Sequence, residues 1–575
     1  MDKRTILALA LVAIVIIVTP KLFPTAVPTT PAKAVPGAPV ATDSIPASAP
    51  IESAATPLPA PATVAAPATR PASDSLGAVA TAGRVDSTVV ADSMAEFLFT
   101  NMGAAPLRVR LPKFRALNSS HGTEDVRITP GDQPLLGYRL IGTADTTQLA
   151  TVPFELTRSE SATGTPVLTY RARVQGRSVQ IEYTVVPDSF LAHVTGSVTA
   201  DSGGAAARFL LIDLPTTFRS FEADSMDDQN HFAYAIKPKV RGAEGIPFGK
   251  MDPGERKLVT GPLEWAAAKS KYFMVGVLAP VGDESFAEAY TIGGARTARH
   301  ATLASGTVVN RLENGTFAFD LYAGPQTYKR LQSMGRDFEN SNPYGGWMQG
   351  VVQPFATMVM KVLLWMRATL KLDYGWLLVI FGVAVRLILW PLNHAAMRTS
   401  MKMQRIQPEL NEIQKKYKQD PQKLQSEMMR VYKEHDMSPF STFAGCLPML
   451  LPMPVLFALF FVFQNTIEFR GVPFLWLADI SLKDPYYIVP LLMGVSMFVL
   501  SWIGMRNSPP NPQAKMMLYI FPVMMTFLFA NFASGLNLYY AIQNIAALPQ
   551  QWLIANERAK GNKVAAGSKL ATKKT

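Results

Sequence analysis

The sequence predicts a polytopic α-helical membrane protein that also carries one large all-β domain. Hydrophobic residues make up 48% of the 575 residues and charged residues only 17%, whereas soluble domains carry about a quarter. Long stretches without a charged residue follow residue 372, and alternating apolar and polar residues, which are typical of strands, lie between residues 91 and 340. A chain of this length is expected to contain more than one domain.

The excess of positive charge lies in the C-terminal part of the chain. The net charge is +12, and residues 341–575 hold 23 basic and 11 acidic side chains, which accounts for all of the excess. Because this region also contains the long apolar stretches, cytoplasmic flanks of membrane helices explain the charge better than nucleic-acid binding does. We therefore expect no nucleic acid as a direct substrate.

The composition also argues against several kinds of site. Cys446 is the single cysteine, which excludes an intrachain disulfide and a multi-cysteine metal site. The six histidines are scattered, and neither a phosphate-binding P-loop nor a nucleophile-elbow motif occurs. We therefore predict no cofactor, no metal and no enzymatic activity.

The first 90 residues are expected to form an anchor and a tether. Thr5–Val18 carries no charge and follows Lys3 and Arg4, so it is either a cleaved signal peptide or a retained anchor. We favour an anchor with its N-terminus inside, because the nearby Ala-x-Ala sequence, at residues 32–34, lies well past the apolar stretch. Residues 20–75 contain 13 prolines and are expected to be an extended, disordered linker.

Residues 91–340 are expected to form the β domain, a sandwich of antiparallel strands. Its short alternating runs are separated by clusters of Gly, Pro, Asn and Asp. The clearest runs lie at residues 167–174, 179–185, 191–198, 271–279 and 315–323.

The next segment, residues 344–371, has a polar and an apolar side when drawn as a helix. This pattern predicts a helix in the membrane interface. A membrane-spanning helix is the alternative, but it would move the basic residues after 392 to the outside, against the positive-inside rule.

The charge-poor stretches then predict five closely spaced spans, six with the N-terminal anchor. With the N-terminus inside, the β domain lies outside and the basic segments lie inside. The predicted parts are an anchor at 1–23, a linker at 24–90, the β domain at 91–340, an interfacial helix at 344–371, spans at 372–391, 444–466, 485–504, 516–531 and 534–554, a cytoplasmic helical hairpin at 392–440, a periplasmic loop at 467–484, a cytoplasmic loop at 505–515 and a basic cytoplasmic tail at 555–575.

Arg386 is the most informative residue of the predicted spans. Placing a charge within a span costs about 2.5 kcal/mol or more and usually marks a wet cavity or a polar partner. No Asp or Glu occurs in the last five spans to pair with it. Tyr540, Gln543 and Asn544 share one face of the last helix at a similar depth. We expect them to face Arg386 and form a positively charged groove; snorkelling of Arg386 to the headgroups is the alternative.

Two further segments are candidates for contacts with partners. The third span is rich in Pro, Met and Phe, which bend a helix and offer an adaptable apolar surface, although ordinary lipid-facing filler explains this run as well. Residues 394–436 carry nine basic and six acidic residues and have a helical pattern broken at Asp420-Pro421. They are either a solvated connector or a docking surface for a partner or for anionic lipids.

An ordered set of motifs resembles the YidC/Oxa/Alb family of membrane protein insertases over nearly the whole chain except the linker. The motifs are Trp265 with Lys271-Tyr272-Phe273, Leu321–Pro325, Val385–Leu392, Gln425-x-Glu427-Met428-Met429-x-x-Tyr432, Gly445-Cys446-Leu447-Pro448, Met453-Pro454, Asp484–Tyr487 and Ser534-Gly535-x-x-x-Tyr539-Tyr540.

The resemblance implies a five-helix insertase core, a periplasmic β-supersandwich, and a hydrophilic groove open to the cytoplasm and to lipid. The groove residues would be Arg386, Gly382, Tyr539, Tyr540, Gln543 and Asn544. Residues of a slide for client helices would be Cys446, Pro448, Met449, Met453, Pro454, Phe457 and Phe527. Many relatives have a Thr where this chain has Gly382, so the resemblance carries no hydroxyl group to that position.

The implied function is insertion and folding of membrane proteins in the bacterial inner membrane, alone or with the Sec translocon. Nascent membrane proteins would be the clients, with ribosomes, Sec components and anionic lipids as further partners. A small-solute or ion transporter is the alternative, and it is disfavoured because proton coupling normally uses carboxylates within the membrane, which the last five spans lack. A membrane hydrolase is disfavoured because no nucleophile–base pair is evident.

We predict that the N-terminal span is retained in the mature protein, because no credible cleavage site adjoins it. The intact mass of protein extracted from membranes should equal that of the full chain. Loss of the first ~25 residues would identify a signal peptide instead.

Overall fold

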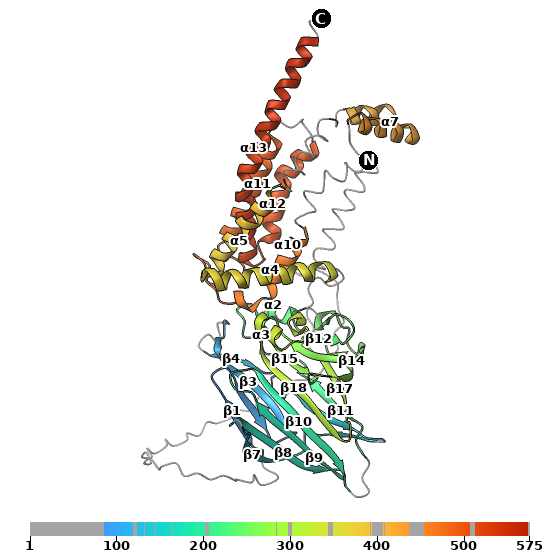
Figure 1. Cartoon of the computed structure of the whole chain (residues 1–575), viewed down its shortest axis with the longest axis vertical. Helices are drawn as coiled ribbons and strands as arrows, with labels where there is room; N and C mark the ends of the chain where they lie inside the picture. Colours follow the sequence, from blue (N-terminus) through green and yellow to red (C-terminus); the bar gives the residue numbers. More distant parts are fainter. Residues whose placement is uncertain are drawn as a thin grey trace, which may run out of the picture. The chain divides into compact units, whose positions relative to one another are not determined.

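A computed structural model gives the structure of the protein (Figure 1). It describes residues 85–118, 124–131, 133–143, 145–162, 164–201, 206–282, 285–296, 302–342, 349–391, 393, 406, 409–435, 453–506 and 512–572. The predicted N-terminal anchor and almost all of the linker lie outside the described residues.

The first described part is a β domain of two antiparallel sheets. The four-stranded sheet has the order β1-β2-β3-β4. Its strands are β1 Ser87–Ala91, β2 Glu96–Thr100, β3 Ala105–Arg115 and β4 Asp125–Ile128.

The second sheet has fourteen strands in the order β6-β5-β11-β17-β16-β14-β15-β18-β10-β9-β8-β7, with β12 paired to both β13 and β14. The strands are β5 Gly137–Ile141, β6 Thr146–Gln148, β7 Glu155–Glu160, β8 Pro166–Val174, β9 Arg177–Val185, β10 Leu191–Ala200, β11 Phe209–Leu214, β12 Ala233–Pro238, β13 Glu244–Pro247, β14 Arg256–Lys269, β15 Phe273–Leu278, β16 Phe286–Gly293, β17 Ala304–Arg311 and β18 Thr316–Pro325. The five alternating runs singled out in the sequence all fall on strands: β8, β9, β10, β15 and β18.

One apolar core runs through both sheets. In β9 every second residue is buried, so Val179, Ile181 and Tyr183 point inward while their neighbours stay partly exposed. Phe97 and Phe99 of β2 belong to the same core cluster. The ring of Phe99 lies 4.8 Å from that of Tyr183, so the small sheet packs against the large one.

Short helices complete the β domain and lead out of it. They are α2 Ser225–Asn230, η1 Phe248–Lys250, α3 Tyr328–Ser333 and η2 Phe338–Ser341. Phe338 is fully buried between the rings of Trp265 and Tyr322, which fixes the end of this domain onto β14 and β18.

The second part is helical. Its long elements are α4 Gln349–Leu370, α5 Tyr374–Ile388, α7 Pro421–Glu434, α10 Met453–Asn465, α11 Ile488–Met505, α12 Pro512–Phe529 and α13 Ser534–Thr572, with the short η4 Ile467–Phe469 after α10. The break predicted near Ser534 is confirmed, because α12 ends before it and α13 begins there.

Only part of the predicted membrane topology is testable in the described residues. There, α11 is the one single helix long and apolar enough to cross a membrane by itself. Val352–Leu370 and Tyr374–Ile388 pass the same test only together, and they meet at a bend of 117°. The predicted count of six membrane-spanning helices is therefore not confirmed.

The predicted helix break at Asp420-Pro421 is confirmed. The side chain of Asp420 accepts a hydrogen bond from the Lys423 backbone N–H at 3.0 Å, and Pro421 occupies the first turn of α7. A small apolar cluster joins α7 to the preceding described residues and consists of Ile406, Leu410, Val431 and Tyr432.

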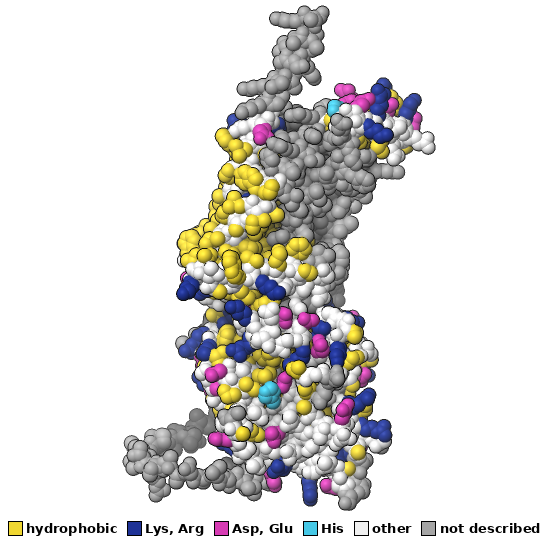
Figure 2. Space-filling model, viewed as in Figure 1, with side chains coloured by type: hydrophobic (Ala, Val, Ile, Leu, Met, Phe, Trp, Pro, Cys, Tyr) yellow, Lys and Arg dark blue, Asp and Glu magenta, His cyan; other side chains and the backbone are white. Residues whose placement is uncertain are grey.

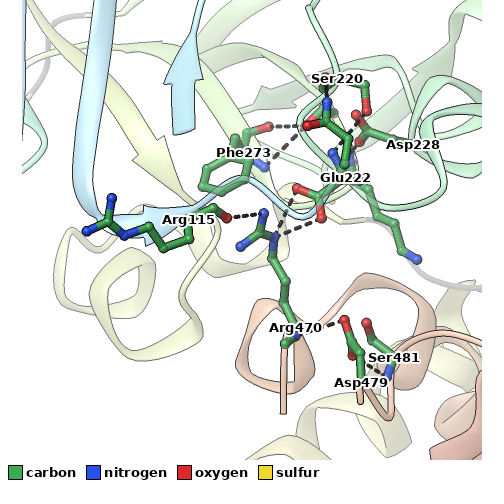
Figure 3. Close-up of polar contacts among 12 residues, drawn as sticks. Arg115, Ser220, Glu222, Asp228, Phe273, Arg470, Asp479 and Ser481 are labelled. Atoms are coloured by element: carbon green, nitrogen blue, oxygen red, sulfur yellow. Dashed lines mark hydrogen bonds and ion pairs between the residues drawn. The ribbon is translucent and has the colours of Figure 1, made fainter. Parts of the chain in front are cut away.

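A buried ion pair joins the β domain to the segment after α10 (Figure 3). The Nε of Arg470 donates to both carboxylate oxygens of Glu222, at 2.8 and 2.9 Å, and its Nη2 donates to the Arg115 carbonyl at 2.9 Å. The side chains of Arg470 and Glu222 are only 6% and 7% exposed. Ile467 belongs to the core cluster of the β domain. The η4 segment is therefore anchored on the β domain by both apolar and charged contacts.

Burial has a further consequence for Glu222. It raises the pKa of this carboxyl group to about 7, against the opposing effect of Arg470. Between pH 4.5 and about 7, Glu222 is therefore protonated in a larger fraction of folded chains than of unfolded chains. The stability that this group contributes is present below pH 4.5 and is lost as the pH rises through about 7.

We predict that Glu222→Gln removes this component of the pH dependence, because an amide does not titrate. Between pH 5 and pH 8 the wild-type protein should lose thermal stability relative to the variant, measured on the full chain in detergent. Glu313→Gln, at an exposed carboxylate, is the matched control. A constant difference in melting temperature between wild type and Glu222→Gln across this range would contradict the prediction.

Candidate functional site

The candidate site lies where α5 contacts α13. Arg386 is in the last turn of α5 and is half-buried. Its Nη2 donates to the side-chain Oε1 of Gln550 on α13 at 3.1 Å. Its Nε is buried without a hydrogen-bond partner among the described residues. Within the same residues no carboxylate pairs with Arg386, so its charge is solvated by an amide rather than neutralised.

Gln543 forms a second link between the two helices. Its Nε2 donates to the Gly382 carbonyl of α5 at 3.1 Å and to the Tyr539 hydroxyl at 2.8 Å. A Cβ atom at Gly382 would lie 3.1 Å from Cγ2 of Ile542. The absence of a side chain at Gly382 therefore lets α13 approach α5 closely. A Thr at this position would require Ile542 to shift.

The other two predicted groove residues point to different neighbours. Asn544 donates to the Met493 carbonyl at 3.4 Å and to the Ser496 hydroxyl at 3.2 Å, both on α11. The ring of Tyr540 packs at 5.5 Å from that of Phe529 on α12, and its hydroxyl is buried without a partner among the described residues.

These contacts correct the expectation that Tyr540, Gln543 and Asn544 together face Arg386. The physical reason is that α13 packs against α5 and α11 and, through Tyr540, contacts α12. Residues on one face of α13 still differ in their angle around the helix axis, and these differences are large enough to direct them to different neighbouring helices. Of the predicted groove residues, Tyr539 and Gln543 of α13 lie together with Gly382, which is one turn before Arg386 on α5. Asn544 instead bridges from α13 to α11.

Gln550 is the polar partner that the sequence interpretation missed. It is 1% exposed and also donates from Nε2 to the Trp390 carbonyl at 3.1 Å. A signal was present in the sequence, because Gln550 follows Gln543 by seven residues and so falls on the same face of a helix.

The predicted slide residues are only partly described. Cys446, Pro448 and Met449 lie outside the described residues, and Met453 and Pro454 begin α10. Phe457 on α10 is half-buried, whereas Phe527 on α12 is 75% exposed.

Exposed apolar side chains gather over the helical part, whereas Lys, Arg, Asp and Glu are frequent on the β domain and on α7 (Figure 2). On α11 and α12 the exposed apolar residues are Ile488, Leu491, Leu492, Val495, Trp502, Met516, Tyr519, Ile520, Val523, Met524 and Phe527. An exposed apolar surface of this extent is unusual for a protein in water and suits contact with lipid or with another apolar helix.

Metal binding finds no support in the described part of the chain. No group of three or more His, Cys, Asp or Glu side chains is placed there to hold an ion. The site instead consists of one guanidinium, two glutamine amides and a tyrosine hydroxyl beside apolar helices. Such groups can bind and orient a polar or anionic segment but supply no nucleophile–base pair.

Comparisons with known proteins match both parts of the chain. The model of the family described as "60Kd inner membrane protein" matches residues 365–562, and that of the "YidC periplasmic domain" matches residues 95–358. A membrane protein insertase YidC from Chlorobaculum tepidum is 29% identical over 545 residues, 89% of each chain. Its counterpart from Chlorobaculum parvum is 30% identical over 449 residues, 74% of this chain and 75% of the relative.

A solved structure is similar as well. The crystal structure of an active YidC insertase with its first transmembrane domain resolved is 17% identical. The match covers 82% of this chain and 93% of that chain, with a TM-score of 0.32.

Proposed function

Because the chain belongs to the YidC family of membrane protein insertases, we propose that it inserts its clients through the polar site around Arg386. The family consists of inner-membrane insertases, which confirms the predicted insertase function and the prediction that the chain is not an enzyme. It also confirms that the β domain is periplasmic and that nascent membrane proteins are the clients. The proposal concerns the residues and the path.

The observation that carries the proposal is the uncompensated charge of Arg386. Its guanidinium hydrogen-bonds to an amide, which leaves the positive charge available to a guest. An acidic side chain in the translocated segment of a client would find at this site a cation in a partly apolar environment, where attraction is stronger than in water. The site thereby lowers the cost of carrying polar groups partway across the membrane.

The apolar helix of the client takes a second path. Apolar side chains exposed on α12, including Phe527, offer it a surface continuous with lipid. Burial of the client helix in lipid drives the step, because transfer of apolar surface out of water is favourable. The slide comprises α12 and the helix that contains Phe457.

The topology that suits this mechanism has six spans, with both termini and the 392–440 hairpin in the cytoplasm. The basic excess of residues 341–575 supports this orientation. The 117° bend after α4 supports an interfacial α4 followed by a spanning α5. The hairpin and the basic tail would then meet ribosomes, Sec components or anionic lipid on the cytoplasmic side.

We predict that Arg386→Ala impairs insertion most for clients with acidic translocated segments, because it removes the attracting charge. Arg386→Lys keeps the charge but loses the planar guanidinium and should retain partial function. The measurement is protease protection of two single-span clients that differ only by Asp or Asn in the outer segment, in liposomes that contain the purified protein. Equal insertion of both clients by Arg386→Ala and by wild type would reduce Arg386 to a snorkelling residue.

We further predict that the β domain is an accessory to insertion, since the polar site lies entirely after residue 340. A deletion of residues 93–320 should leave insertion in the same assay substantially intact. Because Arg470 loses its partner Glu222 in this deletion, a second version carries Arg470→Gln as well. Loss of insertion in both versions, at normal expression, would contradict the prediction.

A further inference from the structure

The side chain of Gln550 forms two hydrogen bonds, one with Arg386 and one with the backbone just after α5. Its Oε1 accepts from the Arg386 guanidinium, and its Nε2 donates to the carbonyl of Trp390, just beyond the last residue of α5. Both distances are 3.1 Å, and the side chain is buried. The amide therefore links α13 to the end of the helix that carries the charge.

The chemistry of the two neighbours fixes the orientation of this amide. Arg386 offers only donors, and the Trp390 carbonyl offers only an acceptor. A flipped amide would place its NH2 group against the guanidinium and its oxygen against the carbonyl, and both hydrogen bonds would be lost. The Gln550 oxygen is thus held toward Arg386.

The neutrality of the side chain matters as much as its hydrogen bonds. A carboxylate at 550 would accept from Arg386 equally well, but it would neutralise the guanidinium and leave the Trp390 carbonyl without a donor. An aliphatic side chain at 550 would leave the charge of Arg386 uncompensated, but the guanidinium would lose its hydrogen bond to that position. An amide is the side chain that both holds Arg386 and leaves its charge uncompensated.

We propose that Gln550 is a positioning residue that sets the preference of the site for acidic client segments. It does so by fixing the Arg386 guanidinium without neutralising it. This inference rests on the proposed function of Arg386 and adds the residue that controls its charge.

The experiment compares insertion of the Asp client with that of its Asn twin by the full-length protein. The ratio of the two cancels differences in the amount of folded insertase. Gln550→Glu should lower the Asp-to-Asn ratio about fivefold, the size of one partly solvated charge attraction, to the value of Arg386→Ala. Gln550→Met keeps the volume and the charge but loses both hydrogen bonds, and should lower the ratio only partway.

Two controls separate this effect from a general disturbance of α13. Gln551→Glu introduces the same charge one residue along the helix, where the side chain lies beside Gly504 of α11, and should leave the ratio at the wild-type value. In an Arg386→Ala background, Gln550→Glu should change the ratio no further. A wild-type ratio in Gln550→Glu, or an equal fall in Gln551→Glu, would overturn the proposal.

The design also distinguishes failure of the inference from failure of the proposed function. If Arg386→Ala itself keeps the wild-type ratio, the proposed function fails and the specificity role of Gln550 fails with it. If Arg386→Ala lowers the ratio and Gln550→Glu does not, only the role of Gln550 is overturned. A thermal-unfolding cycle of Arg386→Ala and Gln550→Ala, singly and together, reports the contact itself, because residues in direct contact give non-additive effects.

Discussion

The cost of placing polar groups among apolar helices governs the arrangement of the helical part. A buried donor or acceptor without a partner loses the hydrogen bonds that it had in water, and a charge loses more. Arg386 carries such a charge, and its hydrogen-bond partner comes from α13 rather than from its own helix. The contact between α5 and α13 is therefore both a packing interface and the means by which the protein keeps a cation in this environment.

Because buried polar groups need hydrogen-bond partners, polar side chains of α13 bind the neighbouring helices and hold them in place. Gln543 donates to a carbonyl of α5, Asn544 to a carbonyl of α11, and Gln550 to the chain just after α5. Further along, Arg558 donates to the Gly504 carbonyl at 2.6 Å. Each of these bonds ends on a backbone carbonyl oxygen. Because such bonds depend on helix position more than on partner side chains, they fix how far each neighbour is rotated and shifted along α13.

The β domain is stabilised mainly by its apolar core, but its contact with the helical part also requires that a buried charge has a partner. Its core is apolar and continuous across both sheets. Where the η4 segment contacts it, the guanidinium of Arg470 is held by the Glu222 carboxylate and by a backbone carbonyl, with almost no exposure of either side chain. Breaking such a pair leaves a buried charge without compensation, which is strongly destabilising. Arg386 contrasts with Arg470. Arg470 is paired with a carboxylate and has a structural role, whereas Arg386 is bound by an amide and its charge stays uncompensated.

The sequence by itself determined the two-part architecture, five of the strands of the β domain (β8, β9, β10, β15 and β18), the break before Ser534 and Arg386 as the informative charge. These properties follow from hydropathy, alternation and turn residues, which act locally along the chain. Only the tertiary structure decided that Asn544 faces α11, that Tyr540 faces α12 and that Gln550 holds Arg386. Helical periodicity places residues on a face to within tens of degrees, whereas α13 has several neighbours at angles of that size. The choice of partner therefore depends on how all the helices pack together, and the sequence of one helix does not contain that information.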